Sequence, residues 1–318
     1  MSLRTRVGAG LRQCYWWRRL RRVQAEGAFR AFSRWQQWRQ VLSTPPVYAD
    51  APGRSAVEVH LLCHRGDSLC AIWALKTLYQ TSGVRWPAVI HVQGACTAAM
   101  KRHFRAHVPD ARVLMQDAAD ARVQQALGNR YPRLVDARRQ SPFMMKLIDP
   151  VLLAAAERLV ILDSDVLFFR EPRELREHVE HAPGDSWLFQ RDPASTYNVT
   201  AEVATSALGI RMPECVNSGI AVVPRRLVDL DLCERLLEHP DVCRPSGWIE
   251  QTLYALCAGA RGNVNFLSPS YVVSLERGLD YDRFTARHYA GPSRPLLTSE
   301  GMPYAAQRGC LGDQAYAA

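Results

Sequence analysis

From residue 56 onward, short apolar runs alternate with longer stretches in which apolar residues recur every three or four positions. The first pattern is typical of buried strands and the second of amphipathic helices. Asp67 stands where a side chain would cap the first helix. The order of strands and helices predicts a mostly parallel sheet covered by helices. We expect strands over residues 56–63, 87–93, 111–115 and 158–162, and helices over 67–79, 98–107 and 142–156.

The second half of the chain carries shorter elements of the same two kinds. We expect strands over residues 186–190, 219–223 and 264–267, and helices over 227–238 and 249–258. These elements complete one α/β domain over residues 45–297, and we expect a loose C-terminal tail over 298–318.

Residues 1–44 are a separate segment, which Pro45 and Pro46 end. Within residues 11–42, apolar residues recur at helical spacing, namely Ala28, Phe32, Trp35, Trp38 and Leu42. Three roles for this helix stay open, in decreasing order of preference. It packs on the domain or on a subunit partner, it lies peripherally on an anionic inner membrane face, or it binds nucleic acid.

Charge separates the same two parts of the chain. The net charge is +9, and residues 1–44 contain ten arginines, no lysine and one acidic residue. Residues 45–318 are therefore electrically balanced, which makes nucleic acid an unlikely partner of the main domain. The nine cysteines form no CxxC pair, and no segment offers an apolar signal core or membrane span. We expect reduced thiols and a cytoplasmic protein.

Two carboxylates follow the most hydrophobic predicted strand. Asp163 and Asp165 come directly after Leu159–Leu162 and are separated by Ser164. Alternate residues of an extended chain point the same way, so both carboxylates can address one cation. Carboxylate oxygens suit Mg²⁺ or Mn²⁺, which bind diphosphate oxygens, and ligands bind at the carboxyl ends of such strands. A strand-end turn with two solvated acids is the alternative.

A short loop near the C-terminus combines an imidazole, a glycine and a cation. His288 can supply a nitrogen ligand to a metal. Gly291 lets the backbone approach a bound phosphate, and the planar guanidinium of Arg294 can grip one. We expect this loop to complete the site that the two aspartates begin.

Together, residues 159–169 and 288–295 resemble the GT-A glycosyltransferases, in particular glycosyltransferase family 8, which includes glycogenin and bacterial lipopolysaccharide galactosyltransferases. That family pairs a strand-end Asp-x-Asp with a His-x-x-Gly-x-x-Lys-Pro loop. The resemblance implies a Rossmann-like mixed sheet with helices on both faces. It also implies that Asp163, Asp165 and His288 hold Mn²⁺ (or Mg²⁺), and that Arg294 replaces the lysine that binds the donor diphosphate.

Three further segments match the family: residues 143–147, 216–222 and 248–252. They imply catalytic roles beside the transferred sugar for Asn217, Glu250 and Gln251. The implied contacts to the nucleotide-sugar donor are Lys146, Ser164, Ser218, Gly219, Gly291 and Arg294. The loop after the first strand, Cys63–Asp67, lacks the aromatic residue that the family often stacks on uracil.

These expectations describe a hexosyltransferase-like enzyme (EC 2.4) that moves a sugar from a nucleotide-sugar, a UDP-sugar first, to a hydroxyl of a glycan or small-molecule acceptor. The resemblance implies retention of the anomeric configuration. An inverting enzyme would need a carboxylate base, for which Asp192 and Glu250 are available. Two alternatives are a haloacid-dehalogenase-type phosphohydrolase and a GT-A scaffold that binds without catalysis.

Overall fold

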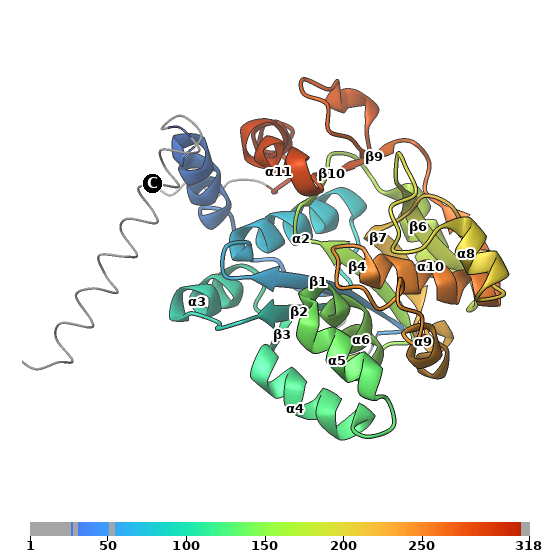
Figure 1. The fold of residues 1–318 in the computed structure, drawn as a ribbon. Coiled ribbons are helices and arrows are strands. Elements are labelled where there is room, and N and C mark those ends of the chain that lie inside the picture. The colour runs from blue at the N-terminus through green and yellow to red at the C-terminus, as the bar shows by residue number, and fades with distance from the viewer. Residues whose placement is uncertain (1–26, 28–30, 51–54, 313–318) are drawn as a thin grey trace, which may run out of the picture.

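The computed structural model describes residue 27 and residues 31–50 and 55–312, and a seven-stranded sheet lies at its centre (Figure 1). The strand order is β3-β2-β1-β4-β7-β6-β8. β1 pairs in parallel with β2 and β4, whereas β7 runs antiparallel to β4 and β6, so the sheet is mixed. The strands are β1 (Val57–His64), β2 (Ala88–Gln93), β3 (Arg112–Met115), β4 (Arg158–Asp163), β6 (Trp187–Arg191), β7 (Val216–Pro224) and β8 (Val264–Phe266).

Helices cover both faces of this sheet, as the sequence predicts (Figure 1). Alternate residues of β4 point to opposite faces: Val160 and Leu162 belong to one buried cluster, and Leu159 and Ile161 to the other. The helices are α2 (Ser68–Ser82), α3 (Ala98–His107), α4 (Gln116–Leu127), α5 (Pro132–Gln140), α6 (Met145–Leu153), α7 (Arg173–His181), α8 (Ala201–Ser206), α9 (Leu230–Leu236), α10 (Ile249–Arg261), α11 (Arg294–Leu296) and α12 (Met302–Gln307).

A second sheet of three short strands lies beside the end of β4. Its order is β5-β10-β9, with β5 at Val166–Phe168, β9 at Tyr271–Val273 and β10 at Ala286–His288. β10 runs antiparallel to β5 in a register that places His288 opposite Val166. This small sheet brings the C-terminal loop back to the strand-end aspartates.

The predicted loose tail is wrong for residues 298–312. Residues 297–301 form a π-helical turn that continues into α12. Met302 and Ala305 are fully buried in the core cluster that also contains α2, and Leu311 packs there too. Burial of these apolar side chains holds the segment on the domain. Residues 313–318 lie outside the described residues.

Residues 31–42 are helical and pack on α2, and the packed face matches the predicted one only in part, through Trp38 and Leu42. Val41 is fully buried and the backbone carbonyl of Gln37 accepts a hydrogen bond of 3.2 Å from Nε1 of Trp73. By contrast, Phe32 and Trp35 are 52% and 48% exposed. Ala28 and most of residues 1–30 lie outside the described residues. Packing on the domain is therefore observed for the described part of this helix.

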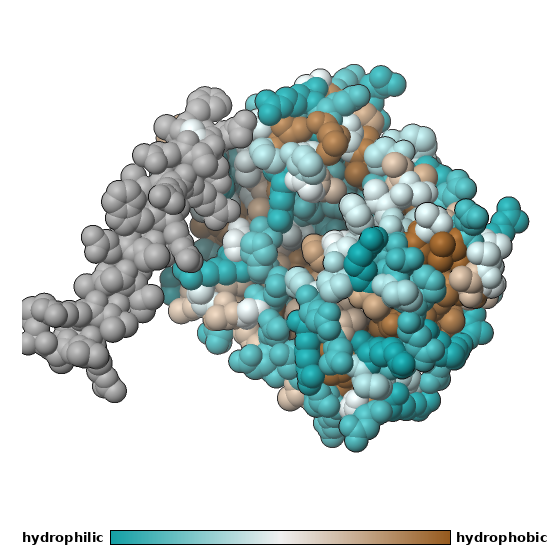
Figure 2. Space-filling model, viewed as in Figure 1, coloured by the Kyte–Doolittle hydropathy of each residue, from teal (hydrophilic) through white to brown (hydrophobic). Residues whose placement is uncertain are grey.

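No helix in the described part of the chain is long and apolar enough to cross a membrane. On the face drawn in Figure 2, the coloured surface is mostly hydrophilic, with apolar residues in small separate groups. The eight cysteines among the described residues all carry free thiols.

Candidate metal and donor site

The turn between β4 and β5 places both aspartates at the carboxyl end of the sheet. β4 ends at Asp163 and β5 begins at Val166, so Ser164 and Asp165 form the turn. The backbone N–H of Tyr289 donates a 2.9 Å hydrogen bond to the carbonyl of Asp165. That bond continues the β5–β10 pairing and fixes the position of His288 beside the turn.

Asp163, Asp165 and His288 converge as predicted. Nε2 of His288 lies 3.3 Å from Oδ1 of Asp165 and 3.5 Å from Oδ2 of Asp163, and one potential ligand atom from each residue lies within 4.8 Å of the others. Two carboxylate oxygens and one imidazole nitrogen suit a divalent cation such as Mn²⁺, which accepts both atom types. The donor set therefore fits the metal implied by the sequence.

A neighbouring amide determines which nitrogen of His288 can bind a metal. Oδ1 of Asn217 accepts a 2.9 Å hydrogen bond from the backbone N–H of Gly219, so this atom is an oxygen acceptor. The same oxygen lies 2.9 Å from Nδ1 of His288, which must therefore carry the proton. Nε2 is left with its lone pair directed at the aspartates. This is the arrangement by which a second residue orients a metal-ligating histidine.

Charges around the site shift the pKa values of its ligands. Burial would lower the pKa of His288, but the hydrogen bond and charge of Asp165 raise it. Burial would raise the pKa of Asp165, but His288 and Arg294 lower it. The raised pKa means that a metal bound at Nε2 would compete with a proton for the position between the two carboxylates.

Lys146 lies on the other side of Asp163, at the start of α6. Its Nζ is 2.8 Å from Oδ1 of Asp163 and 3.5 Å from Oε1 of Glu250, and it donates a 3.1 Å hydrogen bond to Oγ of Ser218. Burial would lower the pKa of Lys146, but the two carboxylates raise it, so the side chain is a fixed cation. Burial and the charge of Asp163 raise the pKa of Glu250 against the opposing effect of Lys146.

Gln251 and Asp192 form the far side of the site. Oε1 of Gln251 accepts a 3.2 Å hydrogen bond from the backbone N–H of Ser218. Its Nε2 donates to the carbonyl and hydroxyl oxygens of Thr196, each at 3.0 Å, and that hydroxyl donates to Asp192 at 2.7 Å. Gln251 thus ties α10 to β7 and to the loop after β6.

Arg294 reaches the site, but in this structure its partners are acidic. Its Nε lies 3.3 Å from Oδ2 of Asp165, and one terminal nitrogen lies 2.8 Å from Oδ2 of Asp67. The expectation that Asp67 caps α2 through its side chain is wrong, because this carboxylate instead pairs with Arg294 and with Nε2 of His64 at 3.0 Å. Gly291 has φ +52°, a conformation that favours glycine, and Ser164 is buried in the turn.

The ion pairs of the site leave an excess of negative charge. The carboxylates in this chain of contacts are Asp67, Asp163, Asp165 and Glu250. In the ion pairs of the described residues, two permanently charged cations contact these carboxylates, Lys146 and Arg294. A divalent cation would neutralise the two remaining negative charges, so the electrostatics agree with the donor set.

Sequence reasoning missed the parts of the site that depend on long-range contacts. It did not foresee that the amide oxygen of Asn217, expected beside the sugar, supports His288. It did not place Asp67 at the site, although the position directly after a strand of the parallel sheet was a usable signal. It also did not place the helix at residues 31–42 beside Asp67 and Arg294, with which Arg34 and Trp38 line one cavity.

Fold and site together define a GT-A architecture with an acidic-histidine cluster at the carboxyl edge of its sheet. No protein-family model matches the sequence, and no curated protein matches it. Among solved structures, the bifunctional glycosyltransferase WbbM is 14% identical with a TM-score of 0.51, covering 84% of this chain and 54% of its own. The chain thus spans about half the length of WbbM.

Two further structures are similar over most of their own length. Mouse xyloside xylosyltransferase 1 is 14% identical with a TM-score of 0.49, covering 76% of this chain and 98% of its own. The galactosyltransferase LgtC, solved with donor and acceptor sugar analogs, is 15% identical with a TM-score of 0.45, covering 80% and 96%. The similarity to WbbM shows a shared fold, so the GT-A fold expected from the sequence is confirmed.

Proposed function

We propose that this protein is a metal-dependent glycosyltransferase that moves a sugar from a nucleoside-diphosphate sugar, a UDP-sugar first, to an acceptor hydroxyl. The convergence of Asp163, Asp165 and His288, with Nδ1 of His288 held by Asn217 and Nε2 facing the aspartates, carries the proposal. These residues would hold Mn²⁺ or Mg²⁺. A bound cation would supply a Lewis acid that takes up charge on the donor diphosphate.

The chain's own cations have separate roles in this proposal. Lys146 is buried and held by Asp163 and Ser218, so it supplies fixed positive charge at the centre of the site. The side chain of Arg294 is 39% exposed, so a donor phosphate can replace Asp67 as its partner. Preorganised charge of this kind is the main means of stabilising a developing diphosphate. Gly291 and Ser164 would lie along the same diphosphate.

The contacts of the two candidate bases favour retention. Glu250 is bound by Lys146 and by the hydroxyl of Ser218 at 3.3 Å, which suits a positioning role. Asp192 accepts a hydrogen bond from Thr196 and so is engaged by a neighbour. Together with Asn217 and Gln251, Glu250 would align the sugar rather than abstract a proton.

Two exposed aromatic side chains beside the site support a glycan as the acceptor. Phe143 is 44% and Trp248 is 49% exposed. Phe143 precedes Lys146 by one helical turn, and its ring lies 3.8 Å from where a Cβ on Gly247 would stand, next to Trp248. Aromatic faces combine an apolar surface with weak polarity and so suit the C–H faces of sugar rings.

The two alternative functions, a phosphohydrolase and a non-catalytic scaffold, have less support from the structure. In a haloacid-dehalogenase-type phosphohydrolase Asp163 would be the nucleophile, but here it is engaged by Lys146 and His288 and belongs to a GT-A fold. A scaffold without catalysis has less support because the metal-ligating set of Asp163, Asp165 and His288 is intact. We also propose a cytoplasmic location, which the free cysteines of the described residues support.

The test is thermal unfolding with UDP, and separately GDP, each with and without Mn²⁺. A ligand at 100 times its dissociation constant stabilises the fold by about 2.7 kcal/mol. We expect a shift that needs nucleotide and metal together, is lost in Asp163→Asn and persists in the control Asp192→Asn. Release of UDP from UDP-sugars then separates an enzyme from a binding scaffold. A folded wild-type protein that shifts with neither nucleotide contradicts the proposal, and phosphatase activity in that protein would favour the phosphohydrolase.

A further inference from the structure

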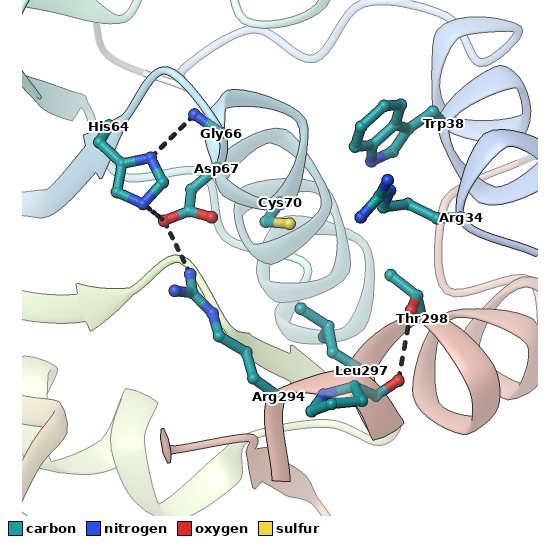
Figure 3. Close-up of a pocket in the computed structure, with 10 residues that line it drawn as sticks. Arg34, Trp38, His64, Gly66, Asp67, Cys70, Arg294, Leu297 and Thr298 are labelled. Atoms are coloured by element: carbon teal, nitrogen blue, oxygen red, sulfur yellow. Dashed lines mark hydrogen bonds and ion pairs between the residues drawn. The ribbon is translucent and has the colours of Figure 1, made fainter. Parts of the chain in front are cut away.

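A cavity of about 290 Å³ lies between the helix at residues 31–42, the loop after β1 and the segment that begins at Arg294. Figure 3 shows Trp38 and Arg34 on one side of it, with His64 and Asp67 on another and Arg294 below. Its volume lies just below the range of about 300–1,000 Å³ that is typical of pockets for whole ligands. The cavity therefore suits one end of an extended ligand.

The cavity and the metal site share one wall. Arg294 lines the cavity, and its side chain pairs with Asp67 on the cavity side and with Asp165 of the metal cluster on the other. A ligand whose diphosphate lies at the metal cluster would pass Arg294 and place its next group in this cavity. In a nucleotide-sugar donor, that group is the nucleoside.

The side chains of the cavity suit a planar heterocycle. Trp38 offers an aromatic face, and its Nε1 is a buried donor without a hydrogen-bond partner among the described residues. Figure 3 shows the nitrogen edge of its ring turned toward Arg34 and the cavity, and the Arg34 guanidinium carbon lies 5.1 Å from the ring centroid. The carboxylate of Asp67 can accept from the N–H groups of a base, while the indole N–H can donate to a base carbonyl.

We propose that Trp38, with Arg34 beside it, completes the nucleobase pocket of the donor from outside the α/β domain. The inference rests on the proposed glycosyltransferase function and adds the segment that recognises the base. The loop Cys63–Asp67 contains no aromatic residue, and Trp38 supplies the aromatic face from the N-terminal helix. That helix is therefore part of the donor site as well as a packing element.

The helix is fixed strongly enough for this role. Oγ of Ser33 donates to the carbonyl of Thr298 at 3.1 Å, and Lys76 of α2 donates to Thr44 and to the carbonyl of Pro45, both at 2.5 Å. These bonds join both ends of the described helix to the domain. A wall held in this way costs little ordering entropy when a ligand binds.

The experiment compares ligands with and without a base on the full-length protein. Calorimetric titrations with Mn²⁺ present would use UDP, GDP and inorganic pyrophosphate against wild type, Trp38→Ala, Trp38→Phe and the exposed control Phe32→Ala. Loss of aromatic stacking should weaken the preferred nucleotide about tenfold to a hundredfold in Trp38→Ala. Pyrophosphate affinity should stay within twofold, Trp38→Phe should recover most of the loss, and Phe32→Ala should bind like wild type.

Two results would overturn the inference alone. In the first, Trp38→Ala binds UDP or GDP as tightly as wild type. In the second, Trp38→Ala loses affinity for nucleotide and pyrophosphate equally, which would mean that Trp38 only supports the fold. Circular dichroism and thermal unfolding identify the second case. A wild-type protein that binds neither nucleotide nor pyrophosphate refutes the proposed function, and with it this inference.

Discussion

The side-chain oxygen of Asn217 lies 2.9 Å from Nδ1 of His288 and at the same time accepts a hydrogen bond from the backbone of Gly219. Asn217 is the second residue of β7, and this end of β7 lies beside the end of β4, since Leu162 is paired with Ile220. One amide therefore connects the sheet to the C-terminal loop and sets the protonation of the proposed metal ligand.

Replacement of Asn217 should weaken the metal site without removing a ligand. Asn217→Ala removes the acceptor that holds the Nδ1 proton and orients the His288 ring. Loss of such a supporting hydrogen bond typically reduces metal affinity about 10–100-fold. Mn²⁺ titration followed by electron paramagnetic resonance measures the change. Asn217→Asp, which keeps an acceptor oxygen, should recover much of the affinity. Unchanged Mn²⁺ affinity in Asn217→Ala would show that the amide does not orient His288.

Gly219 is required by the close approach of His288. A Cβ on Gly219 would stand 2.2 Å from Nδ1 and 2.4 Å from Cε1 of His288, so the ring must move. Gly219→Ala should therefore abolish measurable Mn²⁺ binding. The matched control is Gly247→Ala, whose Cβ would meet only Phe143, at 3.8 Å. Equal Mn²⁺ binding by both variants would contradict the observed packing.

Lys146 should be essential to the stability of the metal-free protein. Lys146→Met leaves the buried Glu250 and its neighbour Asp163 without their cation, and breaking a buried pair in this way costs about 3–5 kcal/mol. Urea unfolding in the presence of a chelator measures the loss. The double variant Lys146→Met/Glu250→Gln removes one of the orphaned charges and should be more stable than Lys146→Met. A double variant no more stable than the single one would show that Glu250 is not coupled to Lys146.

Acid should destabilise the protein through a histidine that is not one of the site residues. His60 of β1 is 1% exposed, and burial together with the charges of His91 and Arg112 lowers its pKa to about 4, although Glu58 opposes the shift. The unfolded chain takes up a proton near the ordinary value of 6.5 and the folded chain only near 4, so stability falls as the pH drops through this window. The contribution is roughly 3 kcal/mol.

Urea unfolding across pH 4 to 7 checks this pH dependence. His60→Gln should show a shallower loss of stability than wild type. His107, whose pKa burial and Lys76 lower to about 4, contributes in the same range and remains in both proteins. Parallel curves for wild type and His60→Gln would exclude His60 as the source.

The exposed aromatic pair should act on the acceptor and not on the donor. Trp248→Ala is expected to raise the KM for a glycan acceptor about tenfold, because an exposed stacking surface is lost, while the KM for the donor stays the same. Leu275→Ala, at a 64% exposed apolar position, is the control. A change in the donor KM instead would place Trp248 at the sugar being transferred.

The sequence predicted much of the fold because several elements are locally encoded. The expected helix at residues 98–107 matches α3, and the strand at 158–162 differs from β4 by one residue. The sequence did not predict α4, α5 and α7, because charged and polar residues fill at least half of each helix. Only a few apolar positions, such as Leu134 and Leu175, face the core. Such helices are held by the domain on which they pack.

Much of the candidate site was also readable from local patterns. A hydrophobic run followed by Asp163 and Asp165, and a loop with His288 and Arg294, indicate a metal and a diphosphate from local sequence alone. These residue types at these spacings determine which chemistry is available. They do not determine which partners each group has.

Tertiary structure alone decided those partners. Asn217 and His288 are 71 positions apart, and their contact depends on a three-residue strand, β10, too short to show a periodic pattern. Asp67 was assigned to a helix cap because capping is a local interaction, whereas Arg294 binds it from more than 200 positions away. Val41, which the periodic pattern did not include, is fully buried against the domain, and Trp38 of the same helix lines the cavity beside Arg294. The sequence specifies each side chain's chemistry, but contacts between distant segments form only when apolar burial offsets the entropy of bringing them together.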